Sequence, residues 1–181
     1  AEDGIRDVAV TGVQTCALPI YQEILTDPSY AGQIVTFTFP HIGNVGTNNE
    51  DIETVDLEQS AGAVGAIFGA PVTEPSNFRS QVKFTEWLVK HGIIALSGID
   101  TRALTTLIRE KGMQNAVIAH SPQGKFDFTA LRDKAKNWSG IDGADLVPTV
   151  GTKKNYHWNE TLWRLGKGYG SQQEKAKYRV V

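Results

Sequence analysis

The chain has few of the residues on which several common classes of protein depend. Its 181 residues include one cysteine, Cys16, which excludes a disulfide framework and a cysteine-rich metal site. No apolar run approaches the length of about 20 residues that a membrane-spanning helix needs. The formal net charge of −2 gives no reason to expect binding to nucleic acid or to an anionic membrane. What is present, 40% hydrophobic and 21% charged residues, is the composition of a globular domain.

The most informative segment is residues 21–48, YQEILTDPSYAGQIVTFTFPHIGNVGTN. Residues 33–39 alternate at the two-residue period of a strand, and Pro40 ends it. The sequence predicts turns on both sides, because Asp27 precedes Pro28 in an arrangement typical of a turn. We expect residues 41–48 to form a loop that no core requires, of the kind that carries binding groups.

The rest of the chain predicts one domain followed by a connector. We expect strands within residues 61–68, 93–96 and 116–119, and helices over residues 82–91 and 129–137. A further helix begins at Asp100 or Thr101 and ends at Gly112, and Gly92 closes the helix before it. Strands that alternate with helices indicate an α/β or α+β fold. The segment after Pro148, rich in Gly, Lys, Asn and Gln, is predicted to be an interdomain linker over residues 151–177.

Four motifs resemble one family. They are the segment 21–48, the segment 92–115 (GIIALSGIDTRALTTLIREKGMQN), the segment 140–150 (GIDGADLVPTV) and the final residues 177–181 (KYRVV). In this order they resemble the small, glutamine-using subunit of carbamoyl-phosphate synthase, chiefly its N-terminal domain. The first two motifs are specific and the last two less so. The resemblance covers nearly all of residues 21–181.

The resemblance implies a fold and a function. The fold is α/β, a three-layer sheet/sheet/helix domain over residues 21–150, with residues 178–181 as the start of a truncated glutamine amidotransferase domain. The whole enzyme would be cytoplasmic and make carbamoyl phosphate from bicarbonate, L-glutamine and ATP, for arginine and pyrimidine biosynthesis. Its large subunit would use ATP and Mg, with no cofactor bound by this chain. The family's catalytic cysteine lies beyond the last residue, so we expect no glutamine hydrolysis by the chain alone.

Residues 1–20, AEDGIRDVAVTGVQTCALPI, have no counterpart in the family. They resemble a sequencing-library adapter translated in frame, with Val8 and Ala9 at the index position. We interpret them as non-native, in place of the domain's first strands, which would leave the fold N-terminally incomplete with an exposed sheet edge. The alternative is a divergent natural N-terminus or a targeting peptide, although a basic start and a long apolar run are both missing.

Ser29 is the one candidate for contact with substrate. The resemblance implies that the serine of the DPSY motif reaches the glutamine site of the following domain. The structural alternative is a turn serine whose hydroxyl bonds its own backbone. No G-x-S-x-G motif surrounds Ser29, so it is not predicted to be a nucleophile, and we assign no catalytic residue to the chain.

Asp100 and Arg102 are candidates for interface or structural roles. An aspartate at a helix start accepts hydrogen bonds from free N–H groups, which is a structural role. Arg102 in the first turn opposes the helix dipole and therefore needs a partner, either inside the domain or on the large subunit. The residues alone leave both options open.

No metal site is predicted. His41, His91, His120 and His157 match no spacing of metal ligands. Two other function classes compete with the subunit reading. One is a stand-alone binding or regulatory module of the same fold, which a stop codon directly after Val181 would favour. The other is a hydrolase that uses Ser29 and His41, which generic ester substrates would test.

Overall fold

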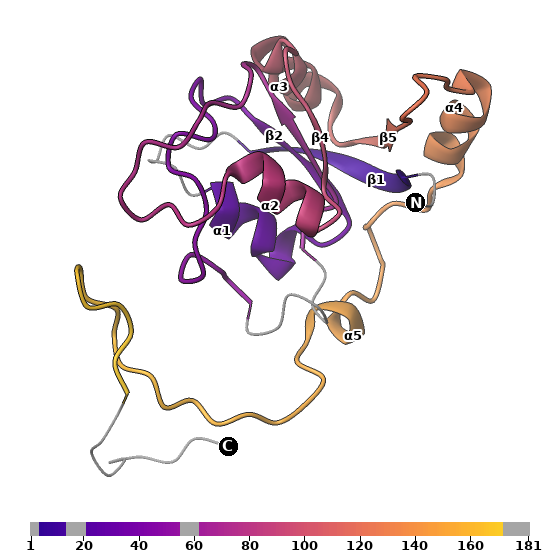
Figure 1. Ribbon diagram of the computed structural model, residues 1–181. Coiled ribbons are helices and arrows are strands. Elements are labelled where there is room, and N and C mark those ends of the chain that lie inside the picture. The colour runs from indigo at the N-terminus through magenta and orange to yellow at the C-terminus, as the bar shows by residue number, and fades with distance from the viewer. Residues whose placement is uncertain (1–3, 14–20, 55–61, 172–181) are drawn as a thin grey trace. The chain divides into compact units, whose positions relative to one another are not determined.

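The computed structural model describes residues 4–13, 21–54 and 62–171 (Figure 1). The chain divides into two compact units, Ala1–Gly151 and Thr152–Val181. The first unit contains the helices and strands, which are, in chain order, β1 (Gly4–Val13), α1 (Tyr21–Thr26), the 3-10 helix η1 (Pro28–Tyr30), β2 (Gln33–Phe37), β3 (Gly65–Phe68), α2 (Phe84–Lys90), β4 (Ile94–Leu96), α3 (Thr101–Lys111), β5 (Gln114–His120), α4 (Phe128–Asn137) and α5 (Val147–Val150).

Five strands form one mostly parallel sheet in the order β4-β3-β2-β1-β5. Strands β1 to β4 run parallel, with Val35 of β2 opposite Thr11 of β1 and Ala66 of β3, and β5 is antiparallel to β1. All five residues of β2 are buried, which is typical of a strand in a sheet covered on both faces. The α/β class predicted from the sequence is therefore confirmed.

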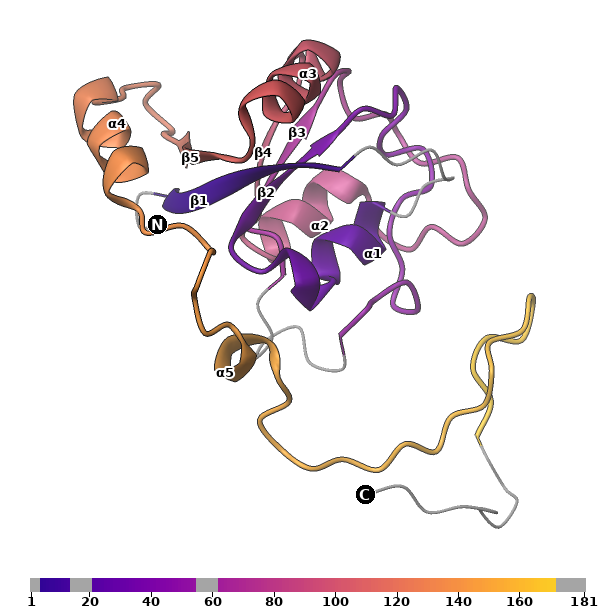
Figure 2. The same ribbon diagram turned by 180° about the vertical axis from the view of Figure 1, so that it is seen from behind.

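The two faces of the sheet carry different apolar clusters. On one face, Val35 and Phe37 pack with side chains of α1 and α2 such as Leu25 and Phe84, and the two helices lie side by side there (Figure 2). On the other face, Ile34 packs with Ile118 of β5 and with side chains of β4 and α3. The larger cluster is the one beneath α1 and α2, so that face holds most of the core.

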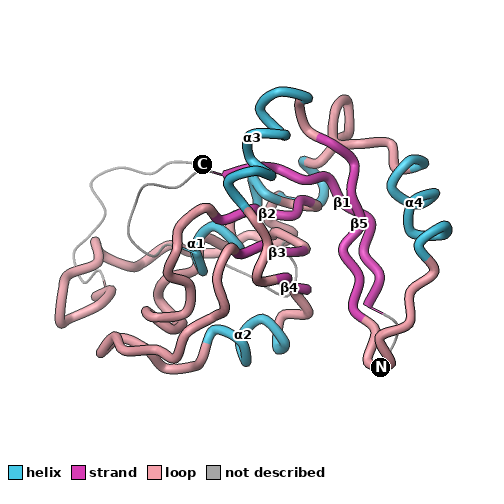
Figure 3. Tube along the Cα trace, turned by 90° about the horizontal axis from the view of Figure 1, so that it is seen from above, coloured by secondary structure: helices cyan, strands magenta, loops and turns pink. Residues whose placement is uncertain are grey.

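The sheet curls so that its two ends meet. Strands β4 and β5, at opposite ends of the strand order, contact each other. Gly65 of β3 lies so close to β5 that a Cβ atom there would be 3.0 Å from Ile118 Cγ2. Figure 3 shows the β1–β5 pair turned away from the plane of β2, β3 and β4. The three-layer arrangement implied by the resemblance stays a prediction.

Strand β1 lies within the segment that we interpret as non-native. Its residues 4–13 pair with both β2 and β5, so the sheet does not end in a bare edge at β2. The expectation of an exposed edge left by missing strands is thus wrong at this position. The origin of residues 1–20 is a separate question, and on that point the prediction stands as a prediction.

Most of the predicted elements are present, and three were missed, namely β1, α1 and α5. The helix at residues 101–111 begins after Asp100, whose Oδ1 accepts a hydrogen bond from Ala103 N at 2.9 Å, and ends at Gly112 with φ of 77°. Helix α1 was wrongly predicted as turns, and α5 lies where no helix was expected. Both are shorter than two turns, so their hydrophobic period is too brief to read. No helix in the described parts of the chain has the length and apolarity to cross a membrane.

Candidate functional site

The turn that carries Ser29 is built by its neighbour Asp27. Asp27 Oδ1 accepts a hydrogen bond from Ser29 N at 2.8 Å, and the Asp27 carbonyl accepts one from Tyr30 N at 3.0 Å. Gln33 Nε2 donates to the carbonyl of Ser29 at 3.1 Å. The turn predicted from Asp27 and Pro28 is confirmed. Its backbone is held at three points, which gives an exposed segment a defined conformation.

The hydroxyl of Ser29 is left free by this arrangement. Ser29 is exposed, and among the described residues none forms a hydrogen bond with its Oγ. The structural alternative, in which the hydroxyl bonds its own backbone, is not what the structure shows: Ser29 N donates to the Asp27 carboxylate, and Ala31 N, two residues further on, donates to the Pro28 carbonyl. The hydroxyl is thus free to bond a polar group outside the described part of the chain.

The segment at residues 41–48 is part of the core, and the expectation that no core requires it is wrong. Ile42, Thr47 and Asn48 are buried. Tyr21 Oη donates to the carbonyl of Gly46 at 2.9 Å, and Thr47 Oγ1 donates to the carbonyl of Val82 at 3.0 Å. The segment therefore joins α1 to the chain that leads into α2, and its turn residues serve packing.

Gln22 holds this segment to α1 through a two-point clamp. Its Nε2 donates to the carbonyl of Asn48 at 2.6 Å, and its Oε1 accepts from Asn48 N at 3.0 Å. The Asn48 side chain continues the network, since its Oδ1 accepts from Glu50 N and Asp51 N and its Nδ2 donates to Asp51 Oδ2. Both Gln22 and Asn48 are buried, so these bonds satisfy groups that water cannot reach.

Two glycines permit the close packing of the segment. Gly43 has φ of 101° and Gly46 has φ of 69°, a region where only glycine is free of strain. A Cβ atom on Gly43 would collide with the backbone of Thr73, and one on Gly46 would collide with Ser80. These glycines are structural, and no phosphate-binding role is needed to explain them.

A charged cluster lies at the end of this network. Arg79 Nη2 contacts Asp51 Oδ1 at 2.6 Å and Glu50 Oε2 at 3.2 Å, and its hydrogen bond to Asp51 is the main cause that raises the pKa of the guanidinium. Burial, followed by the charges of Asp51 and Glu53, raises the pKa of Glu23 on α1. Sequence reasoning missed this cluster, because Arg79 is 28 residues from Asp51 and no local pattern pairs them.

Among the described residues, Tyr21 has the largest resolved shift of pKa. Burial raises the pKa of its hydroxyl to about 12, against the opposing effect of hydrogen bonds to the backbone at Val45, Gly46 and Gly43. The hydroxyl therefore stays protonated at neutral pH and keeps its donor for the Gly46 carbonyl. This is a structural tyrosine and no candidate for acid–base chemistry at neutral pH.

Asp100 and Arg102 occupy the first turn of α3. Asp100 has the capping role that was predicted for it. Arg102 is exposed, and among the described residues none forms a hydrogen bond or ion pair with its guanidinium. A shallow hollow of about 420 Å³ lies beside it, open to solvent and lined in the described parts by Asp100, Arg102, Ala103, Thr106, Leu107 and Glu110.

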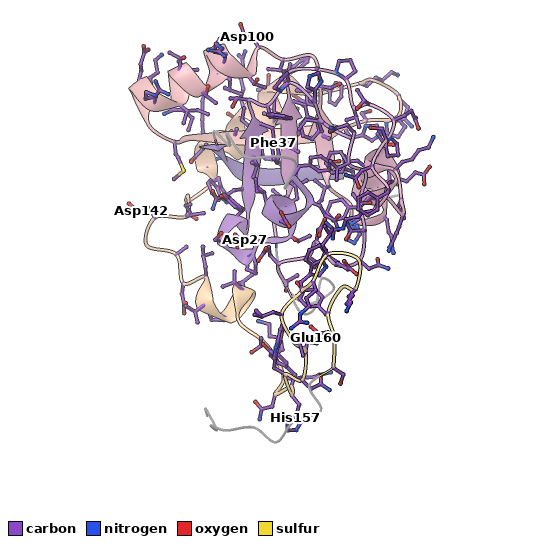
Figure 4. All side chains as sticks on the ribbon, turned by 90° about the vertical axis from the view of Figure 1, so that its left-hand side faces the viewer. Asp27, Phe37, Asp100, Asp142, His157 and Glu160 are labelled. Carbon is purple, nitrogen blue, oxygen red and sulfur yellow. The ribbon has the colours of Figure 1, made fainter. Side chains whose placement is uncertain are left out.

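The predicted site residues are not brought together into one pocket. Asp27, beside Ser29, and Asp100, beside Arg102, are well separated within the first unit (Figure 4). His91 Nδ1 lies 2.8 Å from the carbonyl of Trp87, one turn earlier on α2. In residues 4–13, 21–54 and 62–171 no group of three or more His, Cys, Asp or Glu side chains is placed to hold a metal ion. The structure thus presents two surface features, the Ser29 turn and the α3 face.

Comparison with known proteins places these features in a family. Residues 7–118 match the family model described as carbamoyl-phosphate synthase small chain, CPSase domain. The carbamoyl phosphate synthase small chain of Mesorhizobium japonicum is 60% identical over 165 residues, which are 91% of this chain and 42% of that protein. The small chains of Brucella anthropi and Bradyrhizobium diazoefficiens are 59% and 56% identical over the same length, covering 40% and 41% of those proteins. The chain therefore spans about two fifths of the length of these relatives.

Proposed function

This chain belongs to the carbamoyl-phosphate synthase small-chain family, and from that membership we propose that it forms scaffold and large-subunit interface of a glutamine-dependent carbamoyl-phosphate synthase. The complete enzyme would act in the cytoplasm and combine bicarbonate, L-glutamine and ATP into carbamoyl phosphate for arginine and pyrimidine biosynthesis. The large subunit would bind ATP and Mg. Ammonia for this synthesis would come from glutamine.

The free hydroxyl of Ser29 is the observation that carries a role toward glutamine. The hydroxyl is exposed, and the turn beneath it is fixed by Asp27 and Gln33. Because the turn is already fixed, the Ser29 hydroxyl loses little conformational entropy when it forms a hydrogen bond with a ligand. This favours ligand binding at Ser29. We assign to Ser29 one hydrogen bond to a polar group of glutamine, and no part in bond cleavage.

Replacement of Ser29 by alanine tests this assignment. The experiment uses a full-length small chain in which this chain replaces the matched residues of the Mesorhizobium japonicum protein, assembled with its large chain. Ser29→Ala should raise the glutamine concentration for half-maximal synthesis about twofold to tenfold, the effect of one neutral hydrogen bond. Synthesis from ammonia should be unchanged, because it does not use the glutamine site.

Ser97→Ala is the matched control, since Ser97 is also exposed and lies in another part of the first unit. It should leave both activities unchanged. An unaltered glutamine dependence in Ser29→Ala would remove the substrate contact and leave the chain as scaffold alone.

Arg102 is the residue that we assign to the large-subunit interface. Its guanidinium has no partner among the described residues and borders the hollow on α3. This supports a partner on the large subunit over a partner inside the domain, the two options that the sequence left open. Arg102→Ala should weaken assembly with the large chain and leave the melting temperature of the small chain unchanged. A lower melting temperature with unaltered assembly would assign Arg102 to an internal role instead.

A further inference from the structure

The second unit exposes more large apolar side chains than a linker needs. Five of them lie within residues 156–169, and their exposed fractions are 56% for Tyr156, 63% for Trp158, 87% for Leu162, 74% for Leu165 and 47% for Tyr169. A flexible spacer is usually polar, because exposed aromatic and branched side chains favour association. We call residues 156–171 the aromatic hairpin. Its composition is that of a contact surface.

The backbone of the aromatic hairpin is ordered without a core of its own. Thr161 N donates to the carbonyl of Gly170 at 2.7 Å, and Arg164 N donates to the carbonyl of Gly168 at 3.0 Å. Antiparallel bridges join Glu160 to Ser171 and Arg164 to Gly168, and no residue described in the second unit is buried. A two-stranded hairpin with nothing packed on it is marginally stable in water. It gains stability when another surface covers it.

The charges of the second unit indicate what that surface carries. Lys153, Lys154, Arg164 and Lys167 are basic, and Glu160 is the one acidic residue among those described there. Opposite charge around an apolar centre favours docking in one orientation. The chemistry therefore fits a protein surface with an apolar centre and an acidic rim.

We propose that the aromatic hairpin docks onto the part of a full-length small chain that lies outside the region matched here. The relatives are matched over only 40% to 42% of their length, so more than half of each is polypeptide that this chain does not contain. A surface in the same polypeptide is present at an effective concentration of the order of millimolar, which allows even weak docking. The proposal goes beyond the proposed function and does not depend on Ser29 or Arg102.

Thiol reactivity tests the proposal at single residues. Leu162→Cys and the control Phe78→Cys are made in a Cys16→Ser background, both in this chain alone and in the chimera with the Mesorhizobium japonicum small chain. Leu162 and Phe78 are matched, since they are 87% and 84% exposed. We expect Leu162→Cys to react with a maleimide at least about tenfold more slowly in the chimera than in the chain alone, which corresponds to docking worth about 1.4 kcal/mol. The Phe78→Cys rate should be equal in both.

A second readout does not rely on the chimera. Amide hydrogen exchange in the natural Mesorhizobium japonicum small chain should be slow in the segment aligned with residues 156–165. Equal Leu162→Cys rates in chain and chimera, with fast exchange in the natural protein, would overturn the proposal. The proposal would also be overturned if the aromatic hairpin became protected only when the large chain is added, only at high concentration of this chain alone, or only with a single-stranded oligonucleotide. Each of these results would assign the surface to a different partner.

Discussion

The clamp between Gln22 and Asn48 should be one of the largest single contributions of a polar side chain to the stability of the first unit. Gln22→Leu keeps a side chain of similar size and removes both the donor and the acceptor. The Asn48 carbonyl and N–H, which Gln22 meets at 2.6 and 3.0 Å, would then lie buried without these partners. The residue at position 22 is 3% exposed and Asn48 is 6% exposed, so water does not replace the lost bonds.

The expected loss follows from the cost of leaving buried polar groups unpaired. Each such group costs about 1 to 3 kcal/mol, and two are left behind, so Gln22→Leu should lower the free energy of unfolding by about 2 to 6 kcal/mol. The total stability of a domain is about 5 to 15 kcal/mol. The substitution should therefore consume a large part of the margin and loosen the segment at residues 41–48.

Urea unfolding followed by tryptophan fluorescence measures the effect, since Trp87 reports on the core. Gln81→Leu is the control, because Gln81 is exposed and only its backbone is seen to bond, to the Thr47 carbonyl. It should change the free energy of unfolding by less than about 0.5 kcal/mol. A loss in Gln22→Leu no larger than that of the control would refute the reasoning that this clamp is a main tie between α1 and the segment.

Three further predictions concern the same unit. Burial and nearby carboxylates raise the pKa of Glu23 in the folded state above its unfolded value of about 4.3. The stability that protonated Glu23 contributes is therefore complete below about pH 4.3. It is lost as the pH rises through the folded pKa. Glu23→Gln should thus flatten the fall in stability above about pH 4.3, as urea midpoints from acid to neutral pH would show, and an unchanged profile would contradict it. Gly46→Ala should destabilise by about 1 to 3 kcal/mol beyond the control Gly98→Ala, because the added Cβ collides with Ser80. Gly98 also has positive φ but open space around it, so equal melting temperatures would argue against the collision. Thr36 is fully buried and its Oγ1 has no partner among the described residues, so Thr36→Val should raise the urea midpoint, and a lower midpoint would show that the hydroxyl is satisfied.

Local sequence determined those parts of the structure that depend on a few consecutive residues. The hydrogen bonds from Ala103 N to the Asp100 side chain and from Ser29 N to the Asp27 side chain join residues three and two positions apart. Gly112 ends its helix by its positive φ, which glycine adopts without strain. The two-residue alternation of residues 33–39 likewise predicts a strand without reference to the rest of the chain, although the strand in the structure ends at Phe37, before Pro40. For these features the residue types carry the physical cause, so the sequence predicts them.

The tertiary structure alone decided which distant segments meet. Gln22 bonds Asn48 across 26 residues and Arg79 bonds Asp51 across 28, and neither pair is marked by spacing, because the meeting depends on how the sheet and α1 position both partners. The same cause turned residues 41–48 from an expected binding loop into core, since glycine and asparagine favour turns whether or not something packs on them.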